Sequence, residues 1–171
     1  MTPRDVLSEA VTTCKALTAR YLAGFDDATR TGQAPNLPNH VAWSLGHCAL
    51  TMHRVAEKAD AKPPPPTDFA GPGGPVTAFN TEAIAFGSRP SADETAYPSL
   101  PRCVEIFNAA CDRLAATVRT ASDAQLNQSI PWGPIQAPWW SLVLRMTFHN
   151  GFHTGQIADL RRTFGFKSIF G

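Results

Sequence analysis

The chain has 171 residues, of which 43% are hydrophobic and only 17% are charged. This length suits one domain, residues 1–171, which can bury a sizeable core without disulfides. A disordered chain would show the opposite balance of hydrophobic and charged residues, so that class is excluded. The formal net charge of +1 excludes a general nucleic-acid binder, because such a protein needs a basic surface to displace counterions.

The expected location follows from apolar segments and cysteines. No apolar run is long enough to span a membrane, and none follows Met1 as it does in a signal peptide. The four cysteines, which are Cys14, Cys48, Cys103 and Cys111, form no C-x-x-C pair. Buried unpaired thiols are typical of a reducing compartment. We therefore expect a soluble cytoplasmic protein that binds neither membranes nor nucleic acid.

Two amphipathic helices are predicted before residue 61. The first spans about residues 4–30, with Thr2 as its N-cap and Pro3 as its first residue, and the second runs from the N-cap Asn39 to about residue 60. Apolar residues recur in both at spacings of three and four, which is the pattern of one buried helix face. They are Leu7, Val11, Cys14, Leu17, Tyr21 and Phe25 in the first helix, and Val41, Leu45, Cys48, Met52 and Val55 in the second.

A long connection is predicted over residues 61–101. Nine of the 15 prolines lie in it, together with four glycines, and proline has no N–H to donate to a helix. We expect a crossover with one short helix near residues 77–86. A loop of this length is unusual in a compact domain unless it has a function. Both a lid over a site and a passive strap across the helices fit it.

Two further helices are predicted over about residues 101–121 and 139–164. They are separated by a break at residues 131–138 that is rich in proline and glycine. Arg161 and Arg162 lie in the expected last turn of the final helix, with Gly165 just beyond its end. Strand signals are weak throughout. Four long helices with a long crossover between the second and third predict an all-α four-helix bundle.

The histidines indicate a metal site. His149 and His153 stand one turn apart on the last predicted helix, so both imidazoles can reach one ion at a bond length of about 2.1 Å. His47 is the natural third ligand if the second helix faces the last. Asn150 stands where the H-E-x-x-H zinc peptidases carry glutamate, so their mechanism is excluded. Without other support, a histidine pair at this spacing is more often an ordinary surface or core feature. Because protonated imidazole cannot ligate, metal affinity is expected to fall as the pH drops through about 6.5.

Four further residues are candidates for binding a substrate: Arg54, Arg145, Trp43 and His40. The two arginines are the cations expected nearest the histidines, and ordinary solvated arginines are the alternative. Trp43 would wall a pocket, unless it only fills the core. His40 precedes His47 by two turns, about 10 Å along the axis, so it can line the mouth of a site but cannot share its ion. No Asp or Glu flanks the histidines on their own helices, so no general base is assigned.

Two glycines, Gly151 and Gly155, interrupt the pattern of the last helix. Each costs about 1 kcal/mol relative to alanine inside a helix. A close approach of another helix would offset that cost.

The chain resembles the DinB-like (DinB/YfiT) metalloenzyme family in two motifs. Residues 39–47 (NHVAWSLGH) are similar to the second-helix motif of that family, and residues 149–157 (HNGFHTGQI) are similar to its last-helix motif, which continues through Leu160-Arg161-Arg162 and Gly165. Residues 97–99 (YPS) resemble its pattern before the third helix. The resemblance covers nearly the whole chain, and the paired motifs are more specific than either one alone.

The resemblance implies an up-down-down-up bundle in which His47, His149 and His153 hold a divalent metal. It also implies a homodimer. Known members include mycothiol-dependent maleylpyruvate isomerase and bacillithiol S-transferases. Three imidazoles leave open positions on a metal and suit zinc or nickel.

We therefore expect a metal-dependent transferase, isomerase or hydrolase that acts on a small electrophile. A low-molecular-weight thiol of the mycothiol, bacillithiol or glutathione type would be its cofactor. Two alternatives stay open. One is a non-catalytic stress or sensor protein that binds a metal or a small ligand. The other is a metal-free bundle whose histidine cluster is a relic.

Overall fold

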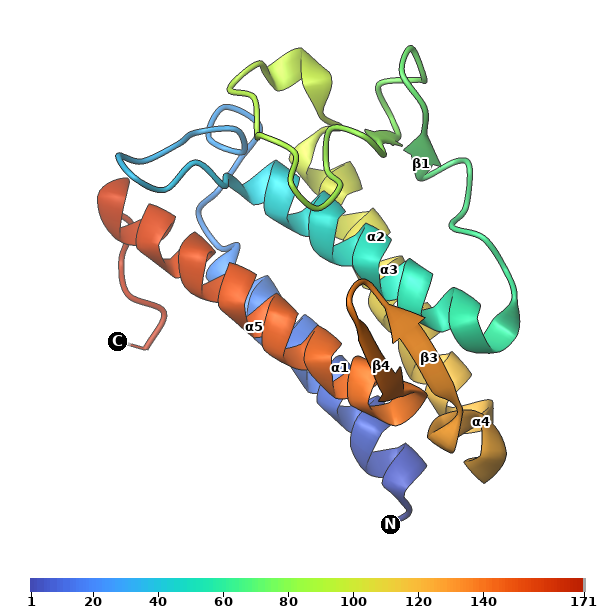
Figure 1. The fold of residues 1–171 in the computed structure, drawn as a ribbon. Coiled ribbons are helices and arrows are strands. Elements are labelled where there is room, and N and C mark those ends of the chain that lie inside the picture. The colour runs from blue at the N-terminus through green and yellow to red at the C-terminus, as the bar shows by residue number, and fades with distance from the viewer. Residues whose placement is uncertain (171) are drawn as a thin grey trace.

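The computed structural model describes residues 1–170 and is mostly helical (Figure 1). Four long helices make up most of the molecule, namely α1 (Pro3–Tyr21), α2 (Val41–Asp60), α3 (Leu100–Thr120) and α5 (Trp139–Thr163). A short helix, α4 (Asp123–Asn127), and a 3₁₀ turn, η1 (Glu94–Ala96), lie in the connections.

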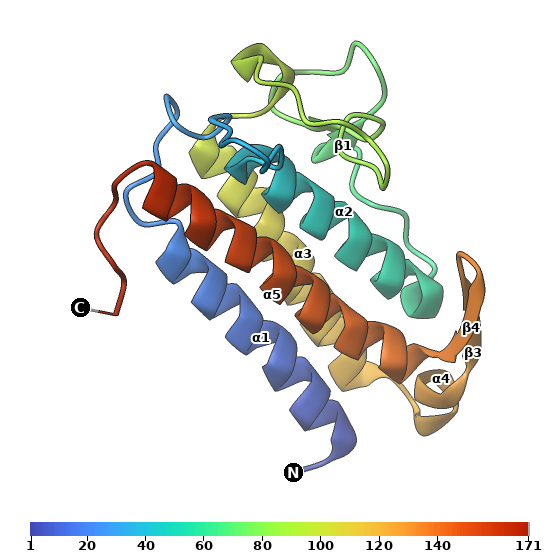
Figure 2. The same ribbon diagram turned by 60° about the vertical axis from the view of Figure 1, so that its left-hand side comes forward.

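The long helices pack around one core. α1 contacts α3 and α5, and α2 contacts the same two helices (Figure 2). The large side chains that are almost completely buried include Leu45, Met52, Phe107, Leu114, Trp139, Leu142 and Ile157. Most of the predicted apolar positions therefore face the core. Leu17 is an exception, because it is 45% exposed on α1.

The first helix is shorter than predicted. α1 ends at Tyr21 rather than near residue 30, and Gly24 follows with a φ of +91°. That left-handed conformation turns the chain back, which suits glycine because it has no Cβ. Phe25 then packs edge-on against Phe164 and Phe166. Phe25 is therefore buried because it packs against the C-terminal segment from a turn, and not because the helix face continues to it.

Helix ends confirm some predicted caps and correct one. Thr2 caps α1 in a capping box, and Gly165 follows α5 with a φ of +71°. The prediction of Asn39 as the N-cap of α2 was wrong by one residue. His40 takes that position, and its Nδ1 accepts from the backbone N–H of Trp43 at 3.2 Å.

The connection between α2 and α3 contains no helix over residues 77–86, so that prediction was wrong. Two short strands, β1 (Phe69–Ala70) and β2 (Phe79–Asn80), pair in parallel there. Asn80 Oδ1 then accepts from the backbone N–H of Glu82 at 2.9 Å, which stabilises a turn instead of a helix. Phe79 is completely buried against Gly46 of α2. This contact fixes the connection on α2.

The proline-rich break before α5 forms a β-hairpin, although strand signals there are weak. β3 (Ser129–Trp132) and β4 (Ile135–Pro138) pair antiparallel, with Trp132 opposite Ile135. Gly133 has a φ of +57° and makes the tight turn. Both views place the hairpin where α2 ends and α5 begins (Figures 1 and 2). α5 starts directly after β4.

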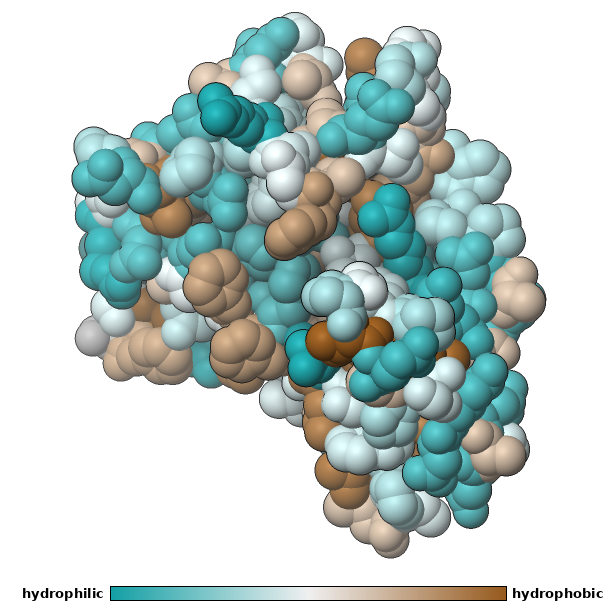
Figure 3. Space-filling model, viewed as in Figure 1, coloured by the Kyte–Doolittle hydropathy of each residue, from teal (hydrophilic) through white to brown (hydrophobic). Residues whose placement is uncertain are grey.

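The surface of the described chain is mixed in polarity. Apolar side chains gather over α5 on the face shown in Figure 3. Within residues 1–170, no helix is both long enough and apolar enough to cross a membrane. The four cysteines are free thiols, and Cys48, Cys103 and Cys111 are buried.

Candidate metal centre

Three histidines converge between α2 and α5. His47 comes from α2, and His149 and His153 come from successive turns of α5. One ring nitrogen of each lies within 4.8 Å of the others, and the Nε2 atoms of His47 and His149 are 3.1 Å apart. Two nitrogens bound to one ion at about 2.1 Å can have such a separation. The predicted triad is therefore assembled in the fold.

The outer nitrogens of two of these rings are fixed by hydrogen bonds. His47 Nδ1 lies 2.7 Å from the carbonyl oxygen of Ile84, and His153 Nδ1 lies 2.9 Å from Gln156 Oε1. Gln156 Oε1 also accepts from Asn39 Nδ2 at 3.1 Å. A carbonyl oxygen can only accept, so both Nδ1 atoms carry the proton. The Nε2 lone pairs of these rings therefore point inward, as metal ligation requires.

The outer nitrogen of His149 has a longer contact, and its partner is a sulfur atom. His149 Nδ1 lies 4.0 Å from the buried Cys48 Sγ. The next residue, Asn150, turns into the core, where its Nδ2 donates to Met52 Sδ at 3.1 Å. The position that would carry the general base of a zinc peptidase is thus engaged with the core.

Burial keeps the three imidazoles neutral. Burial, with a smaller contribution from the neighbouring histidines, lowers the pKa of His149 and of His153 to about 4. Burial also lowers the pKa of His47, and the charge of Arg54 adds to this effect. Neutral imidazole is the form that binds a metal. These shifts move the expected loss of metal affinity from near pH 6.5 to lower pH.

The residues present fit a divalent metal. Three neutral nitrogen donors suit zinc and nickel, and three protein ligands are typical of sites that keep an open position. Among residues 1–170, no fourth histidine, cysteine or carboxylate joins the group.

A cavity of about 430 Å³ adjoins the histidines, and it has a volume typical of small-molecule sites. It lies between α2, α5, the tip of the β3–β4 hairpin and the first part of the connection that follows β2. Its lining comprises His47, Leu50, Thr51, Arg54, Ala85, Phe86, Trp132, Gly133, Pro134, Met146 and His149. A molecule bound in this cavity can therefore contact His47 and His149.

Of the four other residues predicted to bind a substrate, only Arg54 lines the cavity. Arg54 lines the cavity, whereas Arg145 is exposed and is not part of its lining. Trp43 stacks on His47 with ring centroids 4.5 Å apart, so it supports a ligand instead of walling the cavity. His40 is completely buried, and its Nε2 lies 2.9 Å from the carbonyl oxygen of Ser91. With its Nδ1 capping α2, His40 has no free nitrogen for a substrate.

Sequence reasoning missed three parts of the site. The Ile84 carbonyl comes from backbone and has no residue-type signal. Phe86 belongs to a loop whose position in space has no helical periodicity to indicate it. Asn39 and Gln156 stand within the two motifs, but their contact is visible only when α2 and α5 lie side by side.

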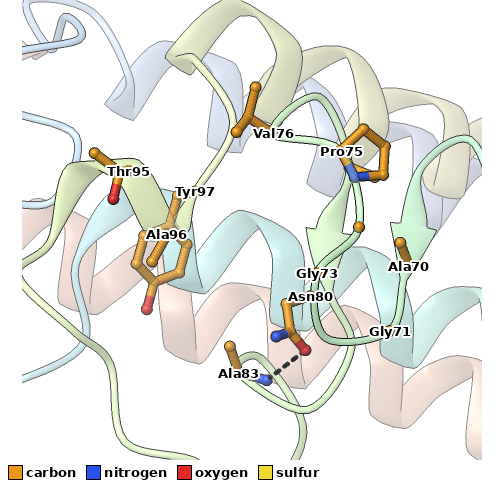
Figure 4. A pocket seen from close by; sticks show the side chains of 12 residues that line it. Ala70, Gly71, Gly73, Pro75, Val76, Asn80, Ala83, Thr95, Ala96 and Tyr97 are labelled. Atoms are coloured by element: carbon orange, nitrogen blue, oxygen red, sulfur yellow. Dashed lines mark hydrogen bonds between the residues drawn. The ribbon is translucent and has the colours of Figure 1, made fainter.

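A smaller hollow of about 170 Å³ lies between the glycine-rich turn after β1 and the 3₁₀ turn (Figure 4). No histidine, cysteine, carboxylate or basic side chain lines it within the described chain. Asn80 points its Oδ1 at the backbone N–H of Ala83, so this amide holds a turn. The hollow therefore offers neither a metal ligand nor a charged side chain among the residues that line it.

Comparisons with known proteins agree with this picture. The model of a family described as the DinB superfamily matches residues 10–157. A solved structure, the conserved protein of a locus from Enterococcus faecalis, is similar in fold, with a TM-score of 0.72 and 16% sequence identity. The similarity covers 95% of this chain and 96% of that one. No curated protein sequence matches the chain.

Proposed function

The chain belongs to the DinB superfamily, and on this premise we propose that it is a divalent-metal-dependent enzyme acting on small electrophiles. Thiol S-transfer or isomerisation is the reaction we assign to it, with a low-molecular-weight thiol as co-substrate. The observation that carries the proposal is the neutral three-histidine cluster open to a cavity of about 430 Å³.

The proposed chemistry divides between the metal and the chain. When bound, zinc or nickel would supply a Lewis acid that lowers the pKa of a thiol or water at its open position. The chain holds the three imidazoles in the ligating tautomer through Ile84 and Gln156. Leu50, Trp132 and Met146 give the cavity an apolar part that can hold the body of a substrate. No carboxylate is among the residues described as lining the cavity, so we assign no general base to a side chain.

Metal content and thiol transfer test this proposal separately. His47→Ala, His149→Ala and His153→Ala should each lose bound metal, measured by elemental analysis of protein purified without a histidine tag. The parent should transfer glutathione or bacillithiol to a small electrophile in a reaction that a chelator stops. Variants that keep the metal content of the parent would overturn the metal site.

The absence of a carboxylate along the described cavity wall favours one alternative, a non-catalytic metal- or ligand-binding stress or sensor protein. Tight metal binding without turnover across a broad panel of thiols and electrophiles would support it. Turnover that a chelator abolishes would exclude it.

We also propose the finer features of the fold that the family resemblance implies. The four long helices form an up-down-down-up bundle, and residues 61–99 are its proline-rich crossover. The pairwise packing of α1 and α2 on both α3 and α5 supports this arrangement. The four free thiols fit a cytoplasmic location, which stays a prediction.

We propose a homodimer formed through α1 and α5. The exposed large hydrophobic residues on these helices are Val6, Leu17, Trp140, Leu144, Phe148 and Phe152. The four on α5 recur every four residues and so form one apolar stripe. A second copy of the chain suits it, because a two-fold contact places the same apolar face on both sides.

Two glycines on α5 support this choice of partner. A Cβ added at Gly151 or Gly155 would meet no atom within 4 Å, so packing inside the chain does not explain them. Phe148 and Phe152 precede them by three residues on the same face. Across a two-fold axis, the phenyl rings of one copy can lie over the glycines of the other. Phe148→Glu should convert the dimer to a monomer in sedimentation experiments. A parent chain that sediments as a monomer at micromolar concentration would overturn the proposal.

A further inference from the structure

The cavity beside the histidines combines features that define the kind of molecule it would hold. Its volume of about 430 Å³ admits a small organic molecule. Its walls carry two groups of different chemistry: an apolar set and one cation. The histidines are at one side, where His47 and His149 contribute to the lining but His153 does not.

The cation is Arg54. It stands seven residues after His47 on α2, with Thr51 between them on the same helix face. Side chains of a helix lean toward its N-terminus, which directs this guanidinium back toward the histidines. Arg54 is exposed, and no carboxylate in residues 1–170 lies within ion-pair distance of it. Its charge is therefore available to a ligand.

The apolar set ends in two aromatic residues from distant parts of the chain. Phe86 lies on the connection after β2 and is 95% exposed, although it lines the cavity. Trp132 lies at the tip of the hairpin and is partly buried. Leu50 and Met146 form the floor between them, from α2 and α5. A flat or branched apolar body would cover these rings.

Phe86 does not lie on a loose loop. Ile84, two residues earlier, accepts through its carbonyl from His47 Nδ1, and it is completely buried. Ser88, two residues later, bonds through its Oγ to Trp43 Nε1 at 3.0 Å. Phe86 is thus held at the mouth of the cavity by both of its flanks. The backbone that carries this exposed phenyl ring is therefore preorganised for contact with a ligand.

We propose that this cavity binds a small amphipathic carboxylate. The apolar body lies between Phe86 and Trp132, and the carboxylate pairs with the guanidinium of Arg54, whose fork of N–H donors matches it. The inference rests on the proposed function, because it names the substrate class of the same site. It assigns Arg54 as a specificity-determining residue that holds the acid apart from the metal position.

Three probes that separate the contribution of the ring from that of the acid test the proposal by isothermal titration calorimetry. Phenylacetate has both the ring and the acid, acetate has only the acid, and 2-phenylethanol has only the ring. The zinc-loaded parent should bind phenylacetate at least about tenfold more tightly than either other probe, because 2-phenylethanol has no charge to pair with Arg54 and acetate has no ring to contact Phe86 and Trp132. Equal affinities for phenylacetate and acetate, or for phenylacetate and 2-phenylethanol, would overturn the proposal.

Variants assign each preference to a residue. Arg54→Gln should remove the preference for phenylacetate over 2-phenylethanol, whereas the control Arg119→Gln, an exposed arginine on α3, should keep it. Phe86→Ala should weaken both aromatic probes and leave acetate unchanged, whereas Phe170→Ala should change none. Arg54 and Phe86 are exposed, so neither substitution removes a core side chain. A carboxylate preference that survives Arg54→Gln contradicts the assignment.

Metal removal separates this inference from the proposed function. In chelator-treated protein, the preference for the carboxylate should persist, because Arg54 holds the acid. If the preference for the carboxylate persists but the protein fails to bind zinc, the proposed metal enzyme is overturned and the proposed carboxylate site is not. If the protein binds zinc and the preference for the carboxylate disappears when zinc is removed, the acid binds the ion and not Arg54. That result would overturn this inference but not the proposed metal enzyme.

Discussion

The outer nitrogens of the histidines determine how well the site can hold a metal. Gln156 Oε1 fixes His153 and accepts from Asn39 as well, so one amide oxygen links α5 to the residue before the α2 cap. Such outer hydrogen bonds orient a ligand ring and select its tautomer. Gln156 is a positioning residue, because its role is exercised through His153.

Gln156→Leu should lower zinc affinity by about 10-fold to 100-fold, which is the usual effect of losing an outer partner of a ligand. Competition with a chromophoric chelator measures the affinity. Gln156→Glu keeps the acceptor oxygen and should restore most of the binding. Gln128→Leu, an exposed glutamine before the hairpin, is the matched control. Equal affinities of the Leu and Glu variants would argue against this role.

Single residues were predictable from the sequence where the residue type itself defines the chemistry. The i, i+4 pair of His149 and His153 was visible as a metal-binding pattern, and His47 followed from the paired motifs. The contact of Ile84 with His47 could not be predicted, because every residue offers the same carbonyl. Arg54 and Arg145 were indistinguishable in sequence, because the helix face that borders a cavity depends on where the hairpin and the connection after β2 lie.

Among the elements, α2 and the connection after it depend on Gly46. A Cβ at this position would lie 2.6 Å from the ring of Phe79, which is closer than a packed contact allows. Phe79 is completely buried and belongs to β2. The glycine therefore lets β2 settle on α2 directly beside His47, and it brings Ile84 within reach of the histidine.

Gly46→Ala should destabilise the fold by about 1–3 kcal/mol, the usual cost of an overpacked core. Urea denaturation followed by circular dichroism measures the change. Gly71→Ala, where a Cβ would meet nothing within 4 Å, is the control and should have little effect. Adding Phe79→Leu to Gly46→Ala should recover part of the loss. No loss of stability in the single variant would contradict the packing described.

The glycines of α5 give the opposite expectation. Because an added Cβ at Gly151 or Gly155 meets nothing in the chain, alanine should stabilise α5 by about 1 kcal/mol at each position through helix propensity alone. The same methyl groups would separate two copies that meet at these glycines. The double alanine variant should therefore unfold at a higher urea concentration as a monomer but dimerise more weakly. Sedimentation across a concentration series measures the strength of dimerisation. A dimer as strong as that of the parent would show that the glycines are not part of the interface.

Elements were predictable where a helix shows a periodic apolar face. The long helices were placed within a few residues, apart from the end of α1. The helix expected near residues 77–86 was wrong because apolar residues such as Phe79 and Ile84 pack there from a strand and turns. The hairpin was missed because prolines hide its alternation, although Gly133 and Pro134 mark its turn.

The whole molecule builds its cavity from the segments that periodicity did not describe. α2 and α5 supply the histidines, but the connection after β2 and the hairpin border the cavity beside them. The connection after β2 therefore contributes to the site in two ways. The carbonyl of Ile84 accepts from His47, and Phe86 lines the cavity. The sequence left open whether this connection is a lid or a passive strap, and its placement favours a role in the site.

Acid stability is a property of the whole fold that the buried histidines determine. Away from the metal site, burial lowers the pKa of His40 and of His53 to about 4, against about 6.5 in an unfolded chain. Between these values the unfolded chain binds more protons than the folded one, so stability is lost as the pH falls from about 6.5 toward 4. At pH 5 each residue should lower the free energy of unfolding by about 2 kcal/mol relative to pH 7.5.

His53 allows this effect to be isolated. Its Nδ1 lies 2.9 Å from the Arg113 guanidinium, and its Nε2 is buried without a partner. His53→Gln keeps an acceptor for Arg113 and removes the titrating group. Urea denaturation of metal-free protein should show a smaller loss of stability between pH 7.5 and pH 5 in this variant than in the parent, by about 2 kcal/mol. Identical pH dependence in the two proteins would show that His53 is not held neutral by burial, and the acid sensitivity would then have to come from His40 and the metal-site histidines.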